Sequence, residues 1–273
     1  MATLDGRDVT PAELQTLALT NYGHFTTMRV EAGRVRGLDL HLARLVRDCR
    51  VVFGAELDPD RVRALVKGAL PAAALPGAGP SGAGSSGLGE ALAVRVTVLD
   101  PAIELGTMGA EAHPKLLVTT RPAGPLSGPA LTVRSCRFTR DLPEVKGVGL
   151  FGMLHQRRLA VRAGYGDALF LDPAGAVCEG STWNIGFVRG GELVRPEAPA
   201  LPGTAMALLR GLRPSVTERV AVDGLGGFEA AFATNAVIGV RPIARIDGTG
   251  FAADHPVLGE LLAAYRDLPG DLL

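Results

Sequence analysis

The fold of this chain is decided by one stretch, Glu179-Gly180-Ser181-Thr182-Trp183-Asn184-Ile185-Gly186-Phe187. Directly before it come the strand-like run 167–172 and the turn Pro173-Ala174-Gly175. A short apolar run, a Pro/Gly turn and a second run rich in β-forming residues predict a β-hairpin.

Glu179 is the unusual residue of this hairpin, because it stands among apolar neighbours such as Val177, Trp183 and Ile185. An ionised carboxylate in apolar surroundings is costly unless a cation or good hydrogen-bond donors meet it. The alternative is a glutamate at a strand end that faces solvent.

A lysine with unusual surroundings precedes the hairpin. Of the 28 lysine and arginine residues, three are lysines: Lys67, Lys115 and Lys146. Only lysine can form an imine, and it loses its proton readily when buried. Lys67 falls in an amphipathic helix and Lys115 just before an apolar strand, so both are expected to be solvated. Lys146 lacks a helical pattern, and the glycines at 147 and 149 would let a ligand approach the backbone; the alternative is a surface-loop lysine.

Composition narrows the class of protein. With 273 residues and 47% hydrophobic content, the chain can bury a core of two domains or one large one. The formal net charge of zero argues against broad electrostatic binding of nucleic acid or an anionic membrane. Cys49, Cys136 and Cys178 lack metal-site spacing, so we expect buried thiols in a reducing compartment and no metal. Without an N-terminal apolar region or a run of ~18 apolar residues, a soluble, cytoplasmic protein is expected.

The first part of the chain predicts a hairpin followed by two helices. Residues 24–36 form the hairpin, turning at Ala32-Gly33. Apolar residues at helical spacing, from Leu38 through Phe53 to Gly54, predict a helix with Asp39 as its N-cap, and a second helix begins at Asp58-Pro59. His41 and Arg44 are three apart and share a helical face, which on its own is typical of a solvated polar surface.

Residues 71–90 are a Pro/Gly/Ala/Ser segment that predicts a flexible loop. Residues 77–82 within it match the pattern GxGxxG, a possible dinucleotide-binding fingerprint with Asp100 as the ribose-binding acid. Neither a preceding strand nor a following helix is predicted, so a NAD enzyme is the weakest alternative.

The remaining elements suggest two domains. Strands are expected over 91–99, 115–120 and 131–137, a strand that enters a small-residue turn over 231–240, and helices over 150–163, 201–210 and 255–266. A Pro/Gly cluster at 121–129 predicts a linker between a small domain (1–120) and a large one (130–273). Free N–H groups after Gly203 at a helix start would make a phosphate cradle.

These pieces together resemble the class IV aminotransferases, the fold-type IV pyridoxal-phosphate (PLP) enzymes. That family includes branched-chain and D-amino-acid transaminases and aminodeoxychorismate lyase. The resemblance runs over most of the chain. Its motifs are Phe25-Thr26-Thr27 with Arg29-Val30, His41-Leu42-Ala43-Arg44-Leu45, Lys146, 166–172 with Gly175, Glu179-Gly180 with Asn184, Leu201-Pro202-Gly203, and Thr234-Asn235-Ala236.

The resemblance implies an α/β (α+β) fold of two domains with the cofactor between them, a homodimer, and roles for individual residues. Lys146 would be the imine-forming lysine, and Glu179 the partner of the pyridine nitrogen. A carboxylate there keeps the nitrogen protonated and makes the ring a better electron sink. The other implied cofactor ligands are Arg44 and the backbone of Gly203, Thr204 and Ala205 for the phosphate, Leu201 for a ring face, and Thr234, Asn235 and Ala236 for a second phosphate turn.

Two positions depart from the family pattern. Branched-chain enzymes carry a tyrosine five residues after the lysine, where this chain has Phe151. The usual Asp-Arg-Gly before the first hairpin is replaced by Asn21-Tyr22-Gly23. Both departures concern the substrate and the tuning of the bond to the cofactor.

The function expected from the resemblance is PLP-dependent transfer of an amino group between an amino acid and a 2-keto acid. The Phe-Thr-Thr hairpin is more similar to the lyase branch, so a lyase that releases pyruvate is the main alternative. A non-catalytic binding protein on the same fold is another. Neither the substrate side chain nor its stereochemistry follows from one sequence.

Overall fold

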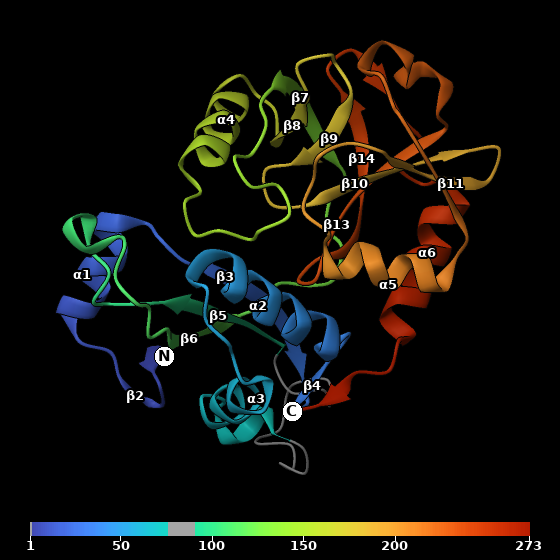
Figure 1. Ribbon diagram of the computed structural model, residues 1–273. Coiled ribbons are helices and arrows are strands. Elements are labelled where there is room, and N and C mark those ends of the chain that lie inside the picture. Colours follow the sequence, from blue (N-terminus) through green and yellow to red (C-terminus); the bar gives the residue numbers. More distant parts are fainter. Residues whose placement is uncertain (1, 76–90) are drawn as a thin grey trace. The chain divides into compact units, whose positions relative to one another are not determined.

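A computed structural model describes residues 2–75 and 91–273 of the chain (Figure 1). The loop predicted over 71–90 therefore lies mostly outside the described residues. The GxGxxG pattern at 77–82 lies entirely outside them. The chain divides into two compact units. Unit 1 comprises Met1–Gly124, Val145–Gly149 and Pro269–Leu273; unit 2 comprises Pro125–Glu144 and Leu150–Leu268.

These units differ from the predicted domains 1–120 and 130–273 in two segments. Residues 145–149, which contain Lys146, belong to unit 1 because the Phe25 N–H donates to the Lys146 carbonyl (2.9 Å) and the Val148 N–H to the Gly23 carbonyl (3.0 Å). The C-terminal segment belongs there because its strand pairs with residues 34–35. Such long-range backbone pairing leaves no local sequence pattern.

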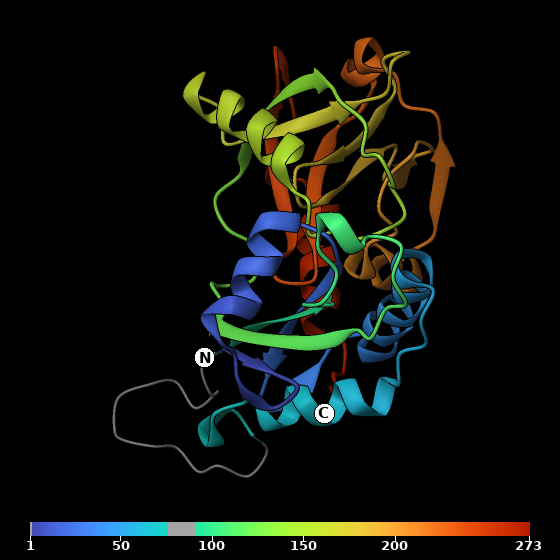
Figure 2. The ribbon, with the colours of Figure 1, turned by 60° about the vertical axis from the view of Figure 1, so that its left-hand side comes forward.

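Unit 1 is built on a seven-stranded sheet in the order β16-β4-β3-β5-β6-β1-β2. Helix α2 packs on β3, and α2 and α3 bury apolar side chains against the sheet. The C-terminal Leu273 joins this core beside Val62 and Val66 of α3, and Figure 2 shows the C-terminus next to that helix. The elements are β1 (Ala2–Leu4), β2 (Arg7–Asp8), α1 (Pro11–Thr20), β3 (His24–Glu31), β4 (Arg34–Val35), α2 (Leu38–Phe53), α3 (Pro59–Gly68), a 3₁₀ turn (Ala72–Ala74), β5 (Leu92–Leu99), a 3₁₀ turn (Leu105–Thr107), β6 (Lys115–Pro122) and β16 (Asp271–Leu272).

Unit 2 is built on a nine-stranded mixed sheet whose two faces are both covered. Because side chains alternate along a strand, β13 directs Ala231 and Ala233 to one core cluster, and Ala230 and Phe232 to the other, where α5 and α6 pack. The elements are β7 (Leu131–Arg137), α4 (Phe151–Arg162), β8 (Asp167–Leu171), β9 (Val177–Gly180), β10 (Asn184–Arg189), β11 (Glu192–Pro196), α5 (Thr204–Leu212), β12 (Ser215–Glu218), a 3₁₀ helix (Val222–Gly227), β13 (Ala230–Asn235), β14 (Gly239–Ile246), β15 (Thr249–Gly250) and α6 (Pro256–Asp267).

The hairpin that decides the fold is present as β8 and β9, and β10 follows after a short turn. Asp167 holds that turn: its buried carboxylate accepts from the Ser181 hydroxyl (2.6 Å) and the Trp183 indole N–H (3.0 Å). Gly180 is required, because a Cβ there would lie 2.0 Å from the Trp183 ring. The turn therefore connects β9 and β10 in one defined conformation.

The first hairpin and the predicted helices are also confirmed, with corrections at two helix starts. The helix expected over 201–210 begins at Thr204. Asp39 is not the N-cap of α2; that position is Gly37, whose φ is +66°, and it provides no side-chain cap. The Leu38 N–H instead donates to the carboxylate of Asp271 (3.0 Å) in β16. A partner 233 residues away caps the helix, which no local capping rule can predict.

Helix α1 was not predicted, although its start carries the known signals. Thr10 accepts from the Glu13 N–H, the Glu13 carboxylate accepts from the Thr10 N–H, and Pro11 is the first helical residue. None of the α1 residues is buried, so the helix lacks the apolar periodicity that identified the others. Among the residues described, no helix combines the length and apolar character needed to span a membrane.

We predict that His24 makes unit 1 sensitive to acid. Both ring nitrogens are buried without a hydrogen-bond partner among the described residues. Burial lowers the pKa of His24 to about 4; Asp48 opposes this shift, and Arg44 and Arg47 add to it. The unfolded chain, with an ordinary histidine pKa near 6.5, binds more protons between pH 6.5 and 4, so the free energy of unfolding falls as the pH is lowered, by about 3 kcal/mol from this group.

Urea unfolding of the wild type and of His24→Leu at a series of pH values measures this contribution. We expect His24→Leu to flatten the acid limb of the stability profile. His155→Leu, the same change at an exposed position on α4, should leave the profile as in the wild type. Identical acid limbs for the wild type and His24→Leu would contradict the prediction.

Candidate functional site

Glu179 lies at the end of β9 and is 4% exposed, so the alternative of a solvent-facing glutamate is wrong. One carboxylate oxygen accepts from the Leu201 N–H (3.2 Å), and the other lies 3.4 Å from an Nη of Arg140. The pairing of β8 with β9 shifts register between Leu169 and Leu171. Such irregularities re-aim side chains in a strand, and on β9 this one falls between Val177 and Gly180, the part of the strand that contains Glu179.

Three polar residues form a row across neighbouring strands of unit 2. Asn184 of β10 is paired with Glu179 of β9 on one side and with Thr234 of β13 on the other. Residues directly opposite each other in antiparallel strands project from the same face of the sheet. The row therefore brings together two predicted site residues, Glu179 and Thr234, with Asn184 between them.

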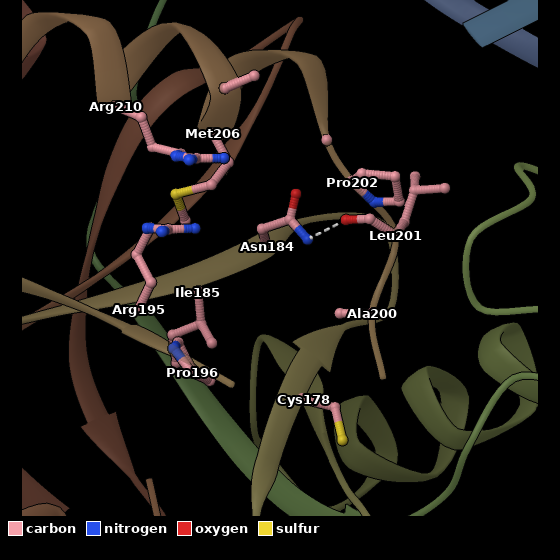
Figure 3. Close-up of a pocket in the computed structure, with 12 residues that line it drawn as sticks. Cys178, Asn184, Ile185, Arg195, Pro196, Ala200, Leu201, Pro202, Met206 and Arg210 are labelled. Carbon is pink, nitrogen blue, oxygen red and sulfur yellow. Dashed lines mark hydrogen bonds between the residues drawn. The ribbon is translucent and has the colours of Figure 1, made fainter. Parts of the chain in front are cut away.

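The segment 201–203 passes this row before α5 begins. The Asn184 amide donates to the Leu201 carbonyl (2.8 Å), as Figure 3 shows. A Cβ on Gly203 would lie 2.0 Å from the amide oxygen of Asn184, so only glycine fits there without displacement of Asn184. Asn184 thus sets the path of the chain into the helix.

Helix α5 starts without a side-chain cap, because its N-cap residue is Gly203. The first N–H groups of a helix have no partner inside the helix, and they attract anions. Thr204 and Ala205, predicted to contribute such groups, are both buried. The helix start can therefore hold a phosphate through backbone N–H groups.

The end of β13 contains the other predicted phosphate-binding residues. The Thr234 hydroxyl is completely buried and has no hydrogen-bond partner among the described residues. The Asn235 side chain holds its own turn, since its oxygen accepts from the N–H groups of Val237 (2.9 Å) and Ile238 (3.0 Å). Ala236 lies within this turn and is half-buried. Thr234 thus presents a polar atom that a ligand could use, whereas the Asn235 oxygen is already used to shape the backbone.

In unit 1, Arg44 belongs to a buried polar group rather than to a solvated helix face. Its Nη2 donates to the Thr26 hydroxyl (2.5 Å), which lies 2.7 Å from Nδ1 of His41. Burial, together with the charges of Arg44 and Lys146, holds the pKa of His41 well below its ordinary value. A neutral His41 can accept the Thr26 proton, which leaves the Thr26 oxygen to accept from Arg44. The guanidinium is therefore held in one orientation.

Lys146 is half-buried, in contrast to Lys67 and Lys115, which are exposed as expected. Its backbone N–H donates to the carboxylate of Asp48 (3.0 Å), a completely buried residue of α2, and its carbonyl accepts from Phe25. Its ammonium nitrogen lies 4.9 Å from the centre of the Phe25 ring. The main chain of Lys146 is thus fixed on both sides, and its side chain extends over an aromatic ring.

Sequence reasoning missed Arg140 and Asp48, the residues that contact Glu179 and Lys146. Arg140 is one of 25 arginines and carries no local signal. Asp48 stands on the helical face of Leu45 and Cys49, and an acid on an apolar face was the available clue. Phe151, at the position where the family resemblance places a tyrosine, is 84% exposed and stacks on His155.

The family model described as amino-transferase class IV matches residues 23–246. A branched-chain-amino-acid aminotransferase from Pseudomonas aeruginosa (strain PAO1) is 31% identical over 153 residues, which is 50% of this chain and 50% of that protein. The chain thus matches about half the length of this curated relative.

Solved structures with the same fold include two branched-chain aminotransferases and one protein with a different description. A branched-chain aminotransferase from Thermoproteus uzoniensis, with norvaline, has a TM-score of 0.78 at 23% identity (97% of this chain, 93% of that one). A branched-chain amino acid aminotransferase from Thermobaculum terrenum in its PLP form has 0.76 at 19% (97% and 92%). A protein from Legionella pneumophila whose structure is described as that of a putative 4-amino-4-deoxychorismate lyase has 0.72 at 21% (92% and 92%). At these identities the likeness concerns the mixed α/β fold of fold-type IV, as expected.

We predict that Gly203→Ala destabilises unit 2. The new methyl group would lie 2.0 Å from the Asn184 amide oxygen and would break the contact that holds the Leu201 carbonyl. The expected loss is about 1–3 kcal/mol in the free energy of unfolding, measured by urea denaturation.

Gly211→Ala is the matched control, because it lies in the same helix and an added Cβ has no atom within 4 Å. It should stabilise the protein by up to about 1 kcal/mol through helix propensity. Equal stabilities of the two variants would show that the Asn184–Gly203 contact is not tight.

Proposed function

The chain belongs to the class IV aminotransferase family, and from that premise we propose that it transfers an amino group between an amino acid and a 2-keto acid with PLP as cofactor. The observation that carries the proposal is the row Glu179–Asn184–Thr234 beside the uncapped start of α5. A buried carboxylate close to a phosphate cradle suits a ligand that carries both a basic ring nitrogen and a phosphate.

The described residues fit PLP by their chemistry. Glu179 is buried, and a protonated pyridine nitrogen would stabilise its negative charge in addition to Arg140. The first N–H groups of α5 and the Thr234 hydroxyl supply donors for a phosphate. When bound, PLP supplies an electron sink that stabilises negative charge at the substrate Cα.

Each predicted residue then has a defined task. Glu179 holds a proton on the pyridine nitrogen. Arg44, oriented by Thr26 and His41, binds phosphate oxygens through two parallel N–H groups, which lysine could not reproduce. Leu201 packs against a face of the ring while its backbone N–H stays on Glu179. Gly203, Thr204 and Ala205, with Thr234, Asn235 and Ala236, form the phosphate-binding backbone.

Lys146 would hold the cofactor through its Nζ, and its free amine would carry the proton removed from the substrate Cα. Both tasks need a neutral amine near pH 7. The fixed main chain between Asp48 and Phe25 confines Nζ to the reach of one side chain, so the same atom can serve both tasks.

We predict that borohydride reduction attaches a pyridoxyl group to the peptide that contains Lys146. Lys146→Ala should retain little PLP, show no absorbance from bound cofactor and transfer no amino group. Lys115→Ala, an exposed lysine near Asp5, should behave as the wild type. A pyridoxyl group on Lys67 or Lys115, or an active Lys146→Ala protein, would refute the assignment.

We predict that Glu179→Gln keeps PLP but slows proton removal from the substrate by roughly two orders of magnitude or more, because the amide cannot hold the ring nitrogen protonated. Stopped-flow absorbance of the first half-reaction measures this step, and equilibrium dialysis measures the retained PLP. Glu192→Gln, a change at an exposed glutamate of β11, is the control. A half-reaction at the wild-type rate in Glu179→Gln would leave Glu179 with a structural role only.

A lyase that releases pyruvate is the second candidate function, favoured by the Phe25-Thr26-Thr27 hairpin. Within that hairpin, the Thr26 hydroxyl already forms hydrogen bonds with Arg44 and His41. A transaminase needs a 2-keto acid to complete its cycle, whereas a lyase turns over without one. Turnover of 4-amino-4-deoxychorismate without a keto acid would favour the lyase, and keto-acid-dependent conversion of amino acids would favour the transaminase.

The proposal includes a homodimer in the cytoplasm that acts on small-molecule amino and keto acids and binds neither nucleic acid nor membrane. Its support is family membership together with the neutral formal charge. Sedimentation equilibrium of the active protein would measure its mass, and a strictly monomeric active species would contradict the dimer.

A further inference from the structure

Unit 2 contains a cavity of about 210 Å³ whose only charged lining residues are two arginines. It lies between β10, β11, the segment 196–203 and α5, as Figure 3 shows. Arg195 comes from β11 and Arg210 from α5, and both side chains are drawn on the Met206 side of the cavity. Neither an aspartate nor a glutamate is among its lining residues.

Arg195 is held in place by neutral groups. Its Nε donates to the Ser215 hydroxyl (2.9 Å) and its Nη2 to the Thr217 hydroxyl, both on the neighbouring strand β12. A guanidinium has five N–H donors, so three remain for another partner. The two hydroxyls orient the guanidinium but carry no charge that would neutralise it. Burial lowers the pKa of Arg195, and the charge of Arg210 lowers it further.

Arg210 projects from the stripe of α5 that faces the cavity. Residues 203, 206, 207 and 210 line it, at the three- and four-residue spacing that places side chains on one helix face, whereas Ala205 and Leu209 pack in the core. Within residues 2–75 and 91–273, neither Arg210 nor Arg195 forms an ion pair. Two positively charged side chains therefore line one cavity, and no carboxylate among the lining residues balances their charge.

We propose that this cavity is a binding site for a phosphate-type oxyanion, either free or carried by a small molecule. Two guanidinium groups match the several oxygens of a phosphate through charge-assisted N–H···O bonds. Asn184 adds an amide to the lining, and Met206 and Ile185 provide apolar walls. The volume suits a phosphate with a short organic body and is smaller than a typical drug-sized pocket.

This site is distinct from the phosphate cradle proposed for the cofactor. Thr204, Ala205 and Thr234 do not line the cavity, and the two arginines have no part in the cradle. The cavity shares Asn184, Leu201 and Gly203 with the candidate cofactor site, so Arg195 and Arg210 are the residues that set it apart. A test must therefore measure phosphate binding that depends on the arginines and not on the helix start.

Isothermal titration of the full chain with inorganic phosphate and with glycerol 3-phosphate tests the proposal. Ionic strength is held constant with chloride, and each titration is run with the protein as purified and after saturation with PLP. We expect saturable binding under both conditions. Arg195→Gln and Arg210→Gln should each weaken it by about tenfold, the usual effect of one lost charge-assisted bond. Tighter binding of one of the two ligands identifies the source of the phosphate group.

Arg213→Gln is the matched control: it removes the same charge three residues from Arg210, but Arg213 pairs with Glu260 (2.8 Å) and does not line the cavity. Its phosphate affinity should equal that of the wild type. Arg210 is exposed, so its replacement tests the site even if Arg195→Gln unfolds. No saturable binding, unchanged affinity in Arg210→Gln, or an equal loss in Arg213→Gln would overturn the proposal. Because binding is measured with and without PLP, its failure is separate from failure of the proposed function.

Discussion

The burial of the Glu179 carboxylate is the constraint on which the candidate site in unit 2 depends. A buried charge must be met by donors or cations, since its desolvation is otherwise too costly. The Leu201 N–H and Arg140 meet it here, so the chain between β11 and α5 has to pass close to the end of β9. Asn184 then fixes the Leu201 carbonyl, and only a glycine fits at 203. The start of α5 and its free N–H groups follow from where that one carboxylate lies.

Unit 1 obeys a similar constraint with different residues. Thr26, His41, Arg44 and Asp48 are all buried at the junction of α2 and β3. Within this group, the neutral state of His41 lets the single hydroxyl of Thr26 connect a histidine and an arginine. Asp48 uses its second oxygen to hold the backbone of Lys146. The lysine is thus attached to the rigid part of the unit and not to a surface loop.

The two arginines at the cavity beside α5, unlike Glu179, have no oppositely charged residue beside them in the cavity lining. Arg195 and Arg210 are supported by hydroxyls and by a helix face but by no acid, so their charge is directed toward the cavity. Some other arginines of unit 2 have carboxylate partners, as Arg189 has in Glu218 and Arg213 has in Glu260, whereas no acid lines the cavity that Arg195 and Arg210 share. This contrast is the physical reason to regard the cavity as a binding site.

The sequence alone determined what rests on local chemistry: the hairpins, most helices, the isolated lysine, and an acid that was unusual for its strand. Periodicity and turn residues suffice for these, because each depends on neighbours within a few positions. It could not determine that Asp271 caps α2, that residues 145–149 pair with β3, or that Glu179, Asn184 and Thr234 form one row. Only the tertiary structure decided these, because each joins residues distant in the chain through hydrogen bonds whose partners are set by strand register and burial.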